Sequence, residues 1–291
     1  MKKDLAPLRN KEQDEKPWEG SCIRKPWDYT VTAVVPCLDT PEQVEICVQL
    51  LRLQTERPYI MLIGTGSTPE AFKRIEAMRS DDLEVHAIRL NGVLHPSDFP
   101  AMAMDSAFSM CRTPYLFATH ADCFLRKRNF LEELVDLVDT KSPVVGYEIS
   151  PRCHKDWPGM VSHTATMYKM EIMDQIGFGW SMRRLSNYYN IKDYRPSMDR
   201  PQWPDTEILG NYILRNNKIE PFLIGSEQNF ERKVDENIDH FRSFTSGKLY
   251  SPGYYHRAEK WYLDAKKEAL GRIKKWEQER KHEKFTAQNS I

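Results

Sequence analysis

The sequence has no excess of positive or negative charge, because 42 lysines and arginines balance 42 aspartates and glutamates over 291 residues. A dedicated polyanion binder is therefore excluded, and contact with nucleic acid would require a local basic patch. Long apolar runs are also missing, since none approaches the roughly 18 residues that a membrane-spanning helix needs. Wholesale disorder is excluded by what is present, because 40% hydrophobic and 11% aromatic residues suffice for a packed core.

The cysteines include no Cys-x-x-Cys pair, so the sequence predicts no structural zinc site. They are Cys22, Cys37, Cys47, Cys111, Cys123 and Cys153. The first residues carry two lysines with no apolar stretch behind them, which is unlike a signal peptide. We therefore expect reduced thiols, a cytoplasmic protein and a loose charged arm over residues 1–26. One further group matches no metal-ligand spacing and is interpreted as chance proximity: Cys153, His154, Asp156 and His163.

Runs of β-branched residues alternate with amphipathic stretches in the N-terminal half. Tyr29 to Val35 predicts a buried strand, and Thr40-Pro41-Glu42-Gln43 predicts a helix start with a capping box. Thr68-Pro69-Glu70 is a second start of this kind. The other predicted elements are strands at 59–63, 83–88, 115–119 and 143–149, a helix at 99–110, and a helix through Leu131 to Val138 with Asn129 as its cap. This alternation predicts βαβ units and a mostly parallel sheet.

The second half of the chain is less regular. Residues 182–204 are dense in Arg, Asn, Tyr, Asp and Pro, which is typical of a long functional loop. A helix over 205–215 and a strand over 219–224 are expected to follow. From Tyr255 to Lys281 the sequence is strongly helical, with one apolar face made of Ala258, Trp261, Tyr262, Ala265, Ala269, Ile273 and Trp276. Lysines and arginines crowd the rest of that helix among acidic residues, so it is either a solvated face or a weak contact for an anionic surface.

In parallel sheets, ligands bind beyond the carboxyl ends of the strands. Here the residues that follow predicted strands are 36–39, 64–67 and 120–123. Four blocks contain or follow these ends: VTAVVPCLDTPEQVEICVQLLRLQT, YIMLIGTGSTPE, AMDSAFSMCRTPYLFATHADCFLRKRNFLEELV and WPDTEILGNYIL. Their order and spacing, over about Tyr29 to His240, resemble the family 2-type glycosyltransferases with a GT-A fold. The resemblance implies a Rossmann-like α/β domain with a mostly parallel central sheet flanked by helices, and a C-terminal helical extension.

Three positions depart from the family pattern. Gly64-Thr65 stands where the family has an acidic pair, His120 replaces the first Asp of the Asp-x-Asp metal motif, and Pro204 replaces the Glu before the base. The first two departures favour one competing hypothesis, a non-catalytic module that binds nucleotide-sugars. A nucleotidyltransferase with a related fold is the other alternative.

The resemblance implies that Asp122 binds Mn²⁺ or Mg²⁺, which would neutralise the diphosphate of a nucleotide-sugar as it leaves. His120 is either a second ligand, which suits Mn²⁺ better than Mg²⁺, a ribose contact, or an ordinary strand-end histidine. His240 falls where many such enzymes have a late metal-binding histidine. Without the resemblance, Asp122 would be interpreted as the cap of a turn.

Asp205 matches the family's catalytic base, which takes the proton from the acceptor during an inverting transfer. Aspartate is also favoured as a helix N-cap, and both roles are compatible at a helix that starts beside a cleft. Glu207, two residues later, is the alternative base.

The remaining candidates would bind the donor. They are Pro36, Cys37, Leu38, Asp39, Gly66, Ser67, Asn91, Asp105, His120, Ala121, Trp180 and Arg242. Each has a structural alternative: Asp39 as a turn residue, Asn91 in a plain Asn-Gly turn, Trp180 as a core residue and Arg242 as a solvated loop residue.

The sequence therefore predicts a metal-dependent, inverting glycosyltransferase that uses a nucleoside-diphosphate-sugar, with UDP-sugar the favoured donor. Residues 27–250 would form the domain, divided into a nucleotide-binding half at 27–125 and an acceptor half at 126–250, with the helical extension at 251–291. A glycan, a lipid, a protein and a modified nucleobase all stay open as acceptors.

Overall fold

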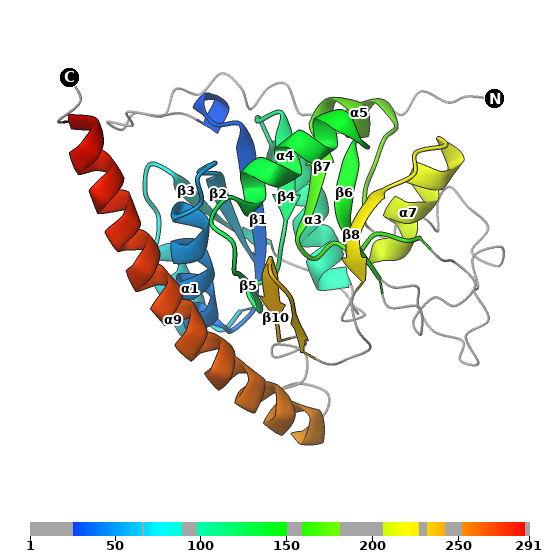
Figure 1. Cartoon of the computed structure of the whole chain (residues 1–291). Coiled ribbons are helices and arrows are strands. Elements are labelled where there is room, and N and C mark those ends of the chain that lie inside the picture. The colour runs from blue at the N-terminus through cyan, green and yellow to red at the C-terminus, as the bar shows by residue number, and fades with distance from the viewer. Residues whose placement is uncertain are drawn as a thin grey trace.

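The computed structural model describes residues 26–65, 67–88, 98–149, 159–180, 206–226, 232–241 and 252–288. A seven-stranded sheet with the order β3-β2-β1-β4-β7-β6-β8 lies at its centre (Figure 1). The strands are β1 (Val31–Cys37), β2 (Tyr59–Thr65), β3 (Leu83–Ile88), β4 (Tyr115–Ala118), β6 (Val144–Glu148), β7 (Thr166–Lys169) and β8 (Phe222–Ser226). β7 runs antiparallel to both its neighbours, and the other pairs are parallel. The predicted α/β class with a mostly parallel sheet is therefore confirmed.

Helices cover both faces of this sheet. One hydrophobic cluster contains residues of α1 (Pro41–Arg52), α2 (Pro69–Glu76), α4 (Phe130–Thr140) and the long α9 (Pro252–Gln288). The opposite cluster contains residues of α3 (Asp98–Met110), α5 (Met170–Gln175) and α7 (Glu207–Asn216). In β1, Ala33 and Val35 belong to the first cluster and Val34 to the second. Such a strand is apolar on both faces, which explains its uninterrupted β-branched run.

The two predicted helix starts turn out differently. Thr68 caps α2, because its side chain accepts a hydrogen bond from the backbone N–H of Ala71 at 3.4 Å. Thr40 precedes α1 but makes no capping bond, and its buried hydroxyl has no hydrogen-bond partner in the part of the chain that the structure describes. The predicted capping box at Thr40 is therefore wrong. Asn129 likewise makes no capping bond and instead donates to the Glu133 carboxylate.

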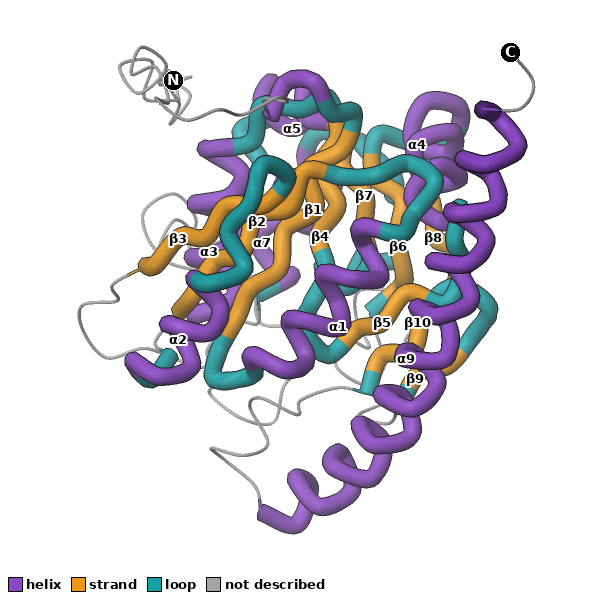
Figure 2. The backbone as a smooth tube through the Cα atoms, turned by 90° about the vertical axis from the view of Figure 1, so that its left-hand side faces the viewer, coloured by secondary structure: helices purple, strands orange, loops and turns teal. Residues whose placement is uncertain are grey.

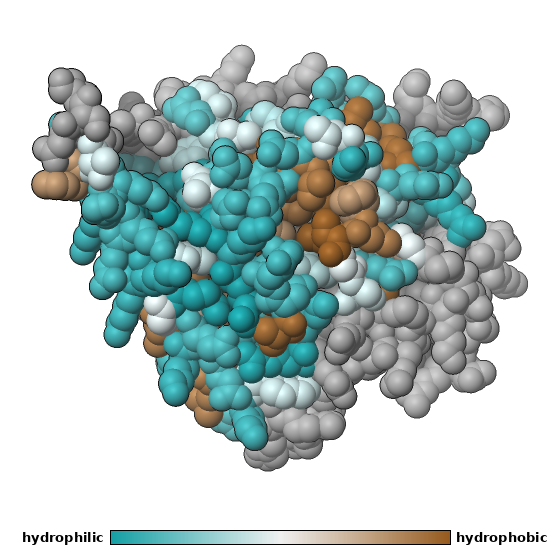
Figure 3. Space-filling view, viewed as in Figure 1, coloured by the Kyte–Doolittle hydropathy of each residue, from teal (hydrophilic) through white to brown (hydrophobic). Residues whose placement is uncertain are grey.

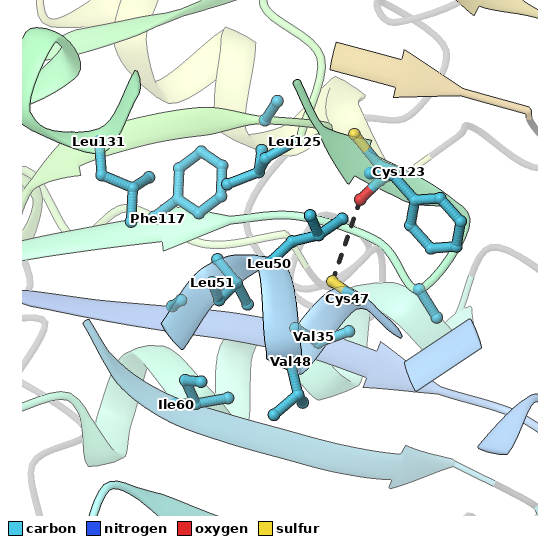
Figure 4. Close-up of a cluster of buried hydrophobic side chains, with 14 of the residues drawn as sticks. Val35, Cys47, Val48, Leu50, Leu51, Ile60, Phe117, Cys123, Leu125 and Leu131 are labelled. Carbon is cyan, nitrogen blue, oxygen red and sulfur yellow. Dashed lines mark hydrogen bonds between the residues drawn. The ribbon is translucent and has the colours of Figure 1, made fainter. Parts of the chain in front are cut away.

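A second, antiparallel sheet of three short strands was not predicted. It consists of β5 (Cys123–Leu125), β10 (Ile238–His240) and β9 (Lys233–Val234). β5 packs on α1, where the thiol of Cys47 approaches the Cys123 carbonyl (Figure 4). Burial, reinforced by the nearby charge of Asp122, raises the pKa of Cys47 to about 12, so this thiol stays protonated. None of the four cysteines in the described ranges forms a disulfide.

α9 runs diagonally across α1 and past the small sheet, as two perpendicular views show (Figure 1 and Figure 2). Most of the predicted apolar face is buried against the body: Tyr262, Ala265, Ala269, Ile273 and Trp276. Glu42 of α1 accepts hydrogen bonds from Tyr262 and from Lys266, whose proximity lowers the pKa of that carboxyl. Within the described residues, α9 and the other helices are all too short or too polar to cross a bilayer.

Candidate active site and metal centre

The carboxyl ends of the parallel strands meet at one edge of the sheet, and the candidate site lies there. β1 and β4 pair in parallel, and Thr119, just after β4, donates its backbone N–H to the Val34 carbonyl at 3.1 Å. β7 enters the sheet at this same edge because it is antiparallel to β4, with Thr166 opposite Ala118. Residues just before β7 therefore lie beside residues just after β4.

A tight turn follows β4 and carries the first two candidate ligands. The Cys123 N–H donates to the His120 carbonyl at 3.1 Å, which closes the turn between β4 and β5. β10 then pairs with β5 so that His240 is opposite Cys123, and the Phe241 N–H donates to the Asp122 carbonyl at 3.0 Å. Two β-ladders, one in each sheet, thus position this turn.

The turn and β10 bring together His120, Asp122 and His240, as their predicted role as ligands requires. His120 Nδ1 lies 3.7 Å and His240 Nε2 lies 3.5 Å from Asp122 Oδ1. One ligand atom from each of the three side chains fits within 4.8 Å of the others. Asp122 and His240 are buried, and His120 is partly exposed.

These three residues fit a divalent transition metal. Metal–ligand bonds of about 2.1 Å place neighbouring ligand atoms about 3.0 to 3.4 Å apart. The three ligand atoms, which lie within 4.8 Å of one another, would therefore move closer together around a shared ion. Burial alone would raise the pKa of the Asp122 carboxyl, but a hydrogen bond from His240 and the charges of His240 and His120 outweigh it and hold that pKa below its usual range. Asp122 would therefore offer a metal ion an anionic oxygen between two imidazoles, a set that suits Mn²⁺ better than Mg²⁺.

A buried histidine–glutamate pair adjoins this cluster, and sequence analysis missed it. His163 Nδ1 lies 2.5 Å from Glu207 Oε1, and both side chains are buried. The His163 ring also packs against His120, with 4.3 Å between the ring centroids. From the sequence, His163 belongs to a chance group with Cys153. Cys153 lies outside the described ranges. No local spacing signals the pair, because its members are 44 positions apart and meet only through the antiparallel β7.

At the end of β1, the predicted nucleotide-binding residues carry structural contacts. Asp39 has a φ of 47°, and its Oδ1 accepts a hydrogen bond from the Thr68 N–H at 2.6 Å. Its own N–H donates to Ser67 Oγ at 3.4 Å. The interpretation of Asp39 as a turn residue is thereby supported, with one carboxylate oxygen engaged. Cys37 is buried, which raises the pKa of its thiol, while Pro36 and Leu38 are partly exposed.

Asp105 and Trp180 form a contact with each other on the other face of the sheet. Asp105 Oδ1 accepts a hydrogen bond from the Trp180 N–H at 2.8 Å. The Trp180 ring is 1% exposed and packs edge-on against Phe108, Tyr168 and Phe178. Of the two interpretations, the core role is favoured for Trp180, because stacking on a sugar requires an exposed ring face.

The remaining candidates divide into buried residues and undescribed ones. Ala121 is buried within the turn between β4 and β5. Asp205, Gly66, Asn91 and Arg242 lie outside the described residues. The departure at Gly64-Thr65 has a packing explanation, since a Cβ on Gly64 would lie 2.8 Å from the Phe72 ring of α2 and Thr65 is buried.

Comparison with known proteins gives only distant structural similarity. No family model and no curated protein sequence matches this chain. A mannosyltransferase from Pyrobaculum calidifontis in complex with GDP-Man and Mn²⁺ aligns over 91% of this chain and 84% of its own, at 15% identity and a TM-score of 0.45. Glucosyl-3-phosphoglycerate synthase from M. tuberculosis aligns over 72% and 75%, at 13% identity and 0.44. Residues 1–349 of S. aureus TarS, in complex with UDP, align over 52% and 50%, at 12% identity and 0.40.

Proposed function

We propose that this protein is a metal-dependent glycosyltransferase of the GT-A type that transfers a sugar from a nucleoside-diphosphate-sugar with inversion. The observation that carries the proposal is the grouping of His120, Asp122 and His240 at the carboxyl edge of a mostly parallel sheet. Ligands bind at such an edge, and a divalent cation there supplies charge neutralisation for a departing diphosphate. The resemblance in sequence order points to the same chemistry.

The chain's own residues would then divide the work. His120, Asp122 and His240 would hold the cation, which would supply the positive charge that neutralises the departing diphosphate. Asp205, two residues before the start of α7, takes the proton from the acceptor hydroxyl as its oxygen attacks C1 of the sugar. The C1–O bond to the diphosphate breaks with its electron pair on the departing phosphate oxygen. Glu207 is the alternative base, because α7 begins with it beside the metal cluster.

A thermal-shift panel of nucleoside-diphosphate-sugars, each with and without Mn²⁺, tests this proposal. We expect one UDP-sugar or GDP-sugar to raise the melting temperature only when Mn²⁺ is present, and to be hydrolysed slowly in the absence of an acceptor. Formation of a nucleotide-sugar from a nucleoside triphosphate would instead identify a nucleotidyltransferase. Metal-dependent binding without hydrolysis or transfer to any acceptor would identify a binding module, and no shift with any donor would contradict the proposal.

We also infer that the outward face of α9 contacts an anionic lipid surface. Four exposed lysines recur on it at seven-residue intervals: Lys260, Lys267, Lys274 and Lys281. Leu263, Leu270 and Phe285 are 58%, 39% and 65% exposed on the same side of the helix. Figure 3 shows the largely hydrophilic surface along α9 interrupted by small hydrophobic patches. Interleaved lysines and apolar side chains are typical of helices that lie on anionic bilayers.

The triple variant K267Q/K274Q/K281Q neutralises three of these four lysines and should weaken vesicle binding by about 100-fold. Each lysine near an anionic membrane contributes about 1 kcal/mol to the binding free energy. The measurement is co-sedimentation with phosphatidylglycerol vesicles, compared with phosphatidylcholine vesicles. The triple variant K73Q/K141Q/K218Q removes the same charge from exposed lysines outside α9, one in α2 and one just after each of α4 and α7, and should bind like the wild type. Equal losses in both variants, or binding to duplex nucleic acid and not to vesicles, would contradict a lipid-directed face.

A further inference from the structure

The segment that carries His163 is held in place by many backbone contacts. The Ser162 N–H donates to the Tyr147 carbonyl at 2.8 Å, and the Thr166 hydroxyl donates to the Ser162 carbonyl at 2.6 Å. Ala165 adopts a φ of 51°, an uncommon value for a residue with a Cβ, as the chain turns into β7. Such strain persists only where the surroundings determine the conformation, and it often marks functional sites. His163 is therefore presented to the sheet edge by a rigid segment.

Glu207 is fixed from the other side by α7. Asn211, one turn later, donates from Nδ2 to the carbonyls of Val161 and Glu207 at 2.8 and 2.9 Å. Its Oδ1 accepts from the Val161 N–H at 2.8 Å. These bonds join the start of α7 to the segment before β7, so the distance between Glu207 and His163 is set by the backbone on both sides.

We propose that the His163–Glu207 pair is a positioning unit for the metal site, which holds the His120 ring in its ligand orientation. This inference rests on the metal site of the proposed function. Glu207 fixes the orientation and the protonated nitrogen of His163, and the His163 ring, 4.3 Å from that of His120, limits rotation of the ligand. Groups that hydrogen-bond directly to a metal ligand contribute about 10- to 100-fold to metal affinity when removed singly, and we expect an effect of this order from the pair that packs on His120.

Stability alone is a poor explanation for this pair. Two buried polar side chains lose their hydration, and well-packed apolar residues of similar volume usually stabilise a fold as much or more. The pair also adjoins the three candidate ligands at one point only. His163 packs on His120, whereas His240 and Asp122 contact each other. Its effect should therefore fall on one ligand of three.

The test measures Mn²⁺ binding to the protein without a donor, by isothermal titration calorimetry and by the ¹⁴N modulation in pulsed electron paramagnetic resonance of the bound ion. Glu207→Gln is expected to weaken binding at least 10-fold and to reduce the modulation from two imidazole nitrogens to one. The double variant His163→Leu/Glu207→Leu, which removes the ring that packs on His120 and fills the space with apolar groups, should keep the fold and show the same loss. Glu84→Gln is the matched control, since it removes a carboxylate 3.2 Å from His86 on the edge strand β3.

The outcomes separate this inference from the proposed function. Variants that bind Mn²⁺ within twofold of the wild type, with two nitrogens still coupled, would overturn the positioning role and leave the metal site intact. Weakened binding in Glu84→Gln to the same extent would also overturn it, because the effect would then be general. A wild-type protein that binds no Mn²⁺ at all would overturn both the metal site and its positioning unit.

Discussion

Asp122→Ala is expected to abolish detectable Mn²⁺ binding and to lower the rate of sugar transfer by roughly 10³-fold, which corresponds to about 4 kcal/mol of lost charge stabilisation. Asp122 is the one carboxylate of the three clustered ligands, and the two imidazoles that remain carry no negative charge with which to hold the ion. Transfer from a radiolabelled nucleotide-sugar, measured over a range of Mn²⁺ concentrations, gives the size of the effect.

Asp136→Ala is the control for this change, because it removes an exposed carboxylate from α4 and should leave transfer unaltered. A retained rate in Asp122→Ala at ordinary Mn²⁺ concentrations would show that the ion is bound elsewhere or is not needed. In that case the clustered histidines would have to be explained without a metal, and the proposed function would lose the observation that carries it.

Asp205→Asn should lower kcat by about 10²- to 10⁴-fold, the usual contribution of a general base. Donor KM and Mn²⁺ affinity should stay within twofold of the wild type, since the amide keeps the size of the side chain and no metal contact is assigned to it. Steady-state kinetics with a saturating donor, together with calorimetry of Mn²⁺, make this separation.

Glu207→Gln distinguishes the two candidate bases. As a positioning residue, Glu207 acts through His120, so saturating Mn²⁺ should restore most of the transfer rate in this variant. As the base, its loss would not be recovered by any concentration of metal. A large kcat defect in Glu207→Gln that persists at saturating Mn²⁺, beside a normal rate in Asp205→Asn, would transfer the catalytic role to Glu207.

Every strand of the large sheet except β7 could be predicted from the sequence, and the central strands β1, β2 and β4 were the clearest because they are buried on both faces. Val31 to Val35 have apolar or β-branched side chains on each face, and turn or cap signals such as Thr68-Pro69 separate one element from the next. Local signals fail where a strand is held by its neighbours. β5 and β10 have three residues each, too few for any periodicity, and their pairing is decided by contacts across more than a hundred positions.

The candidate site was predictable only in part for the same reason. Asp122 and His120 follow a recognisable strand, and His240 was found from its order in the resemblance. The contact between His163 and Glu207 depends on the reversed direction of β7, which no sequence pattern announced. Trp180 shows the same dependence on tertiary packing, because its burial against Phe178, which favours the core role, cannot be read from the sequence.

The pairing of β10 with β5 has one more consequence. A metal ion held by Asp122 and His240 would be a cross-link between two points 118 positions apart along the chain. Closing so long a loop costs the chain conformational entropy, and an ion at 100 times its Kd would add about 2.7 kcal/mol to the folded state. The ion that neutralises the donor would then also stabilise the fold, and its occupancy would set how readily the pairing of β10 with β5 opens to solvent.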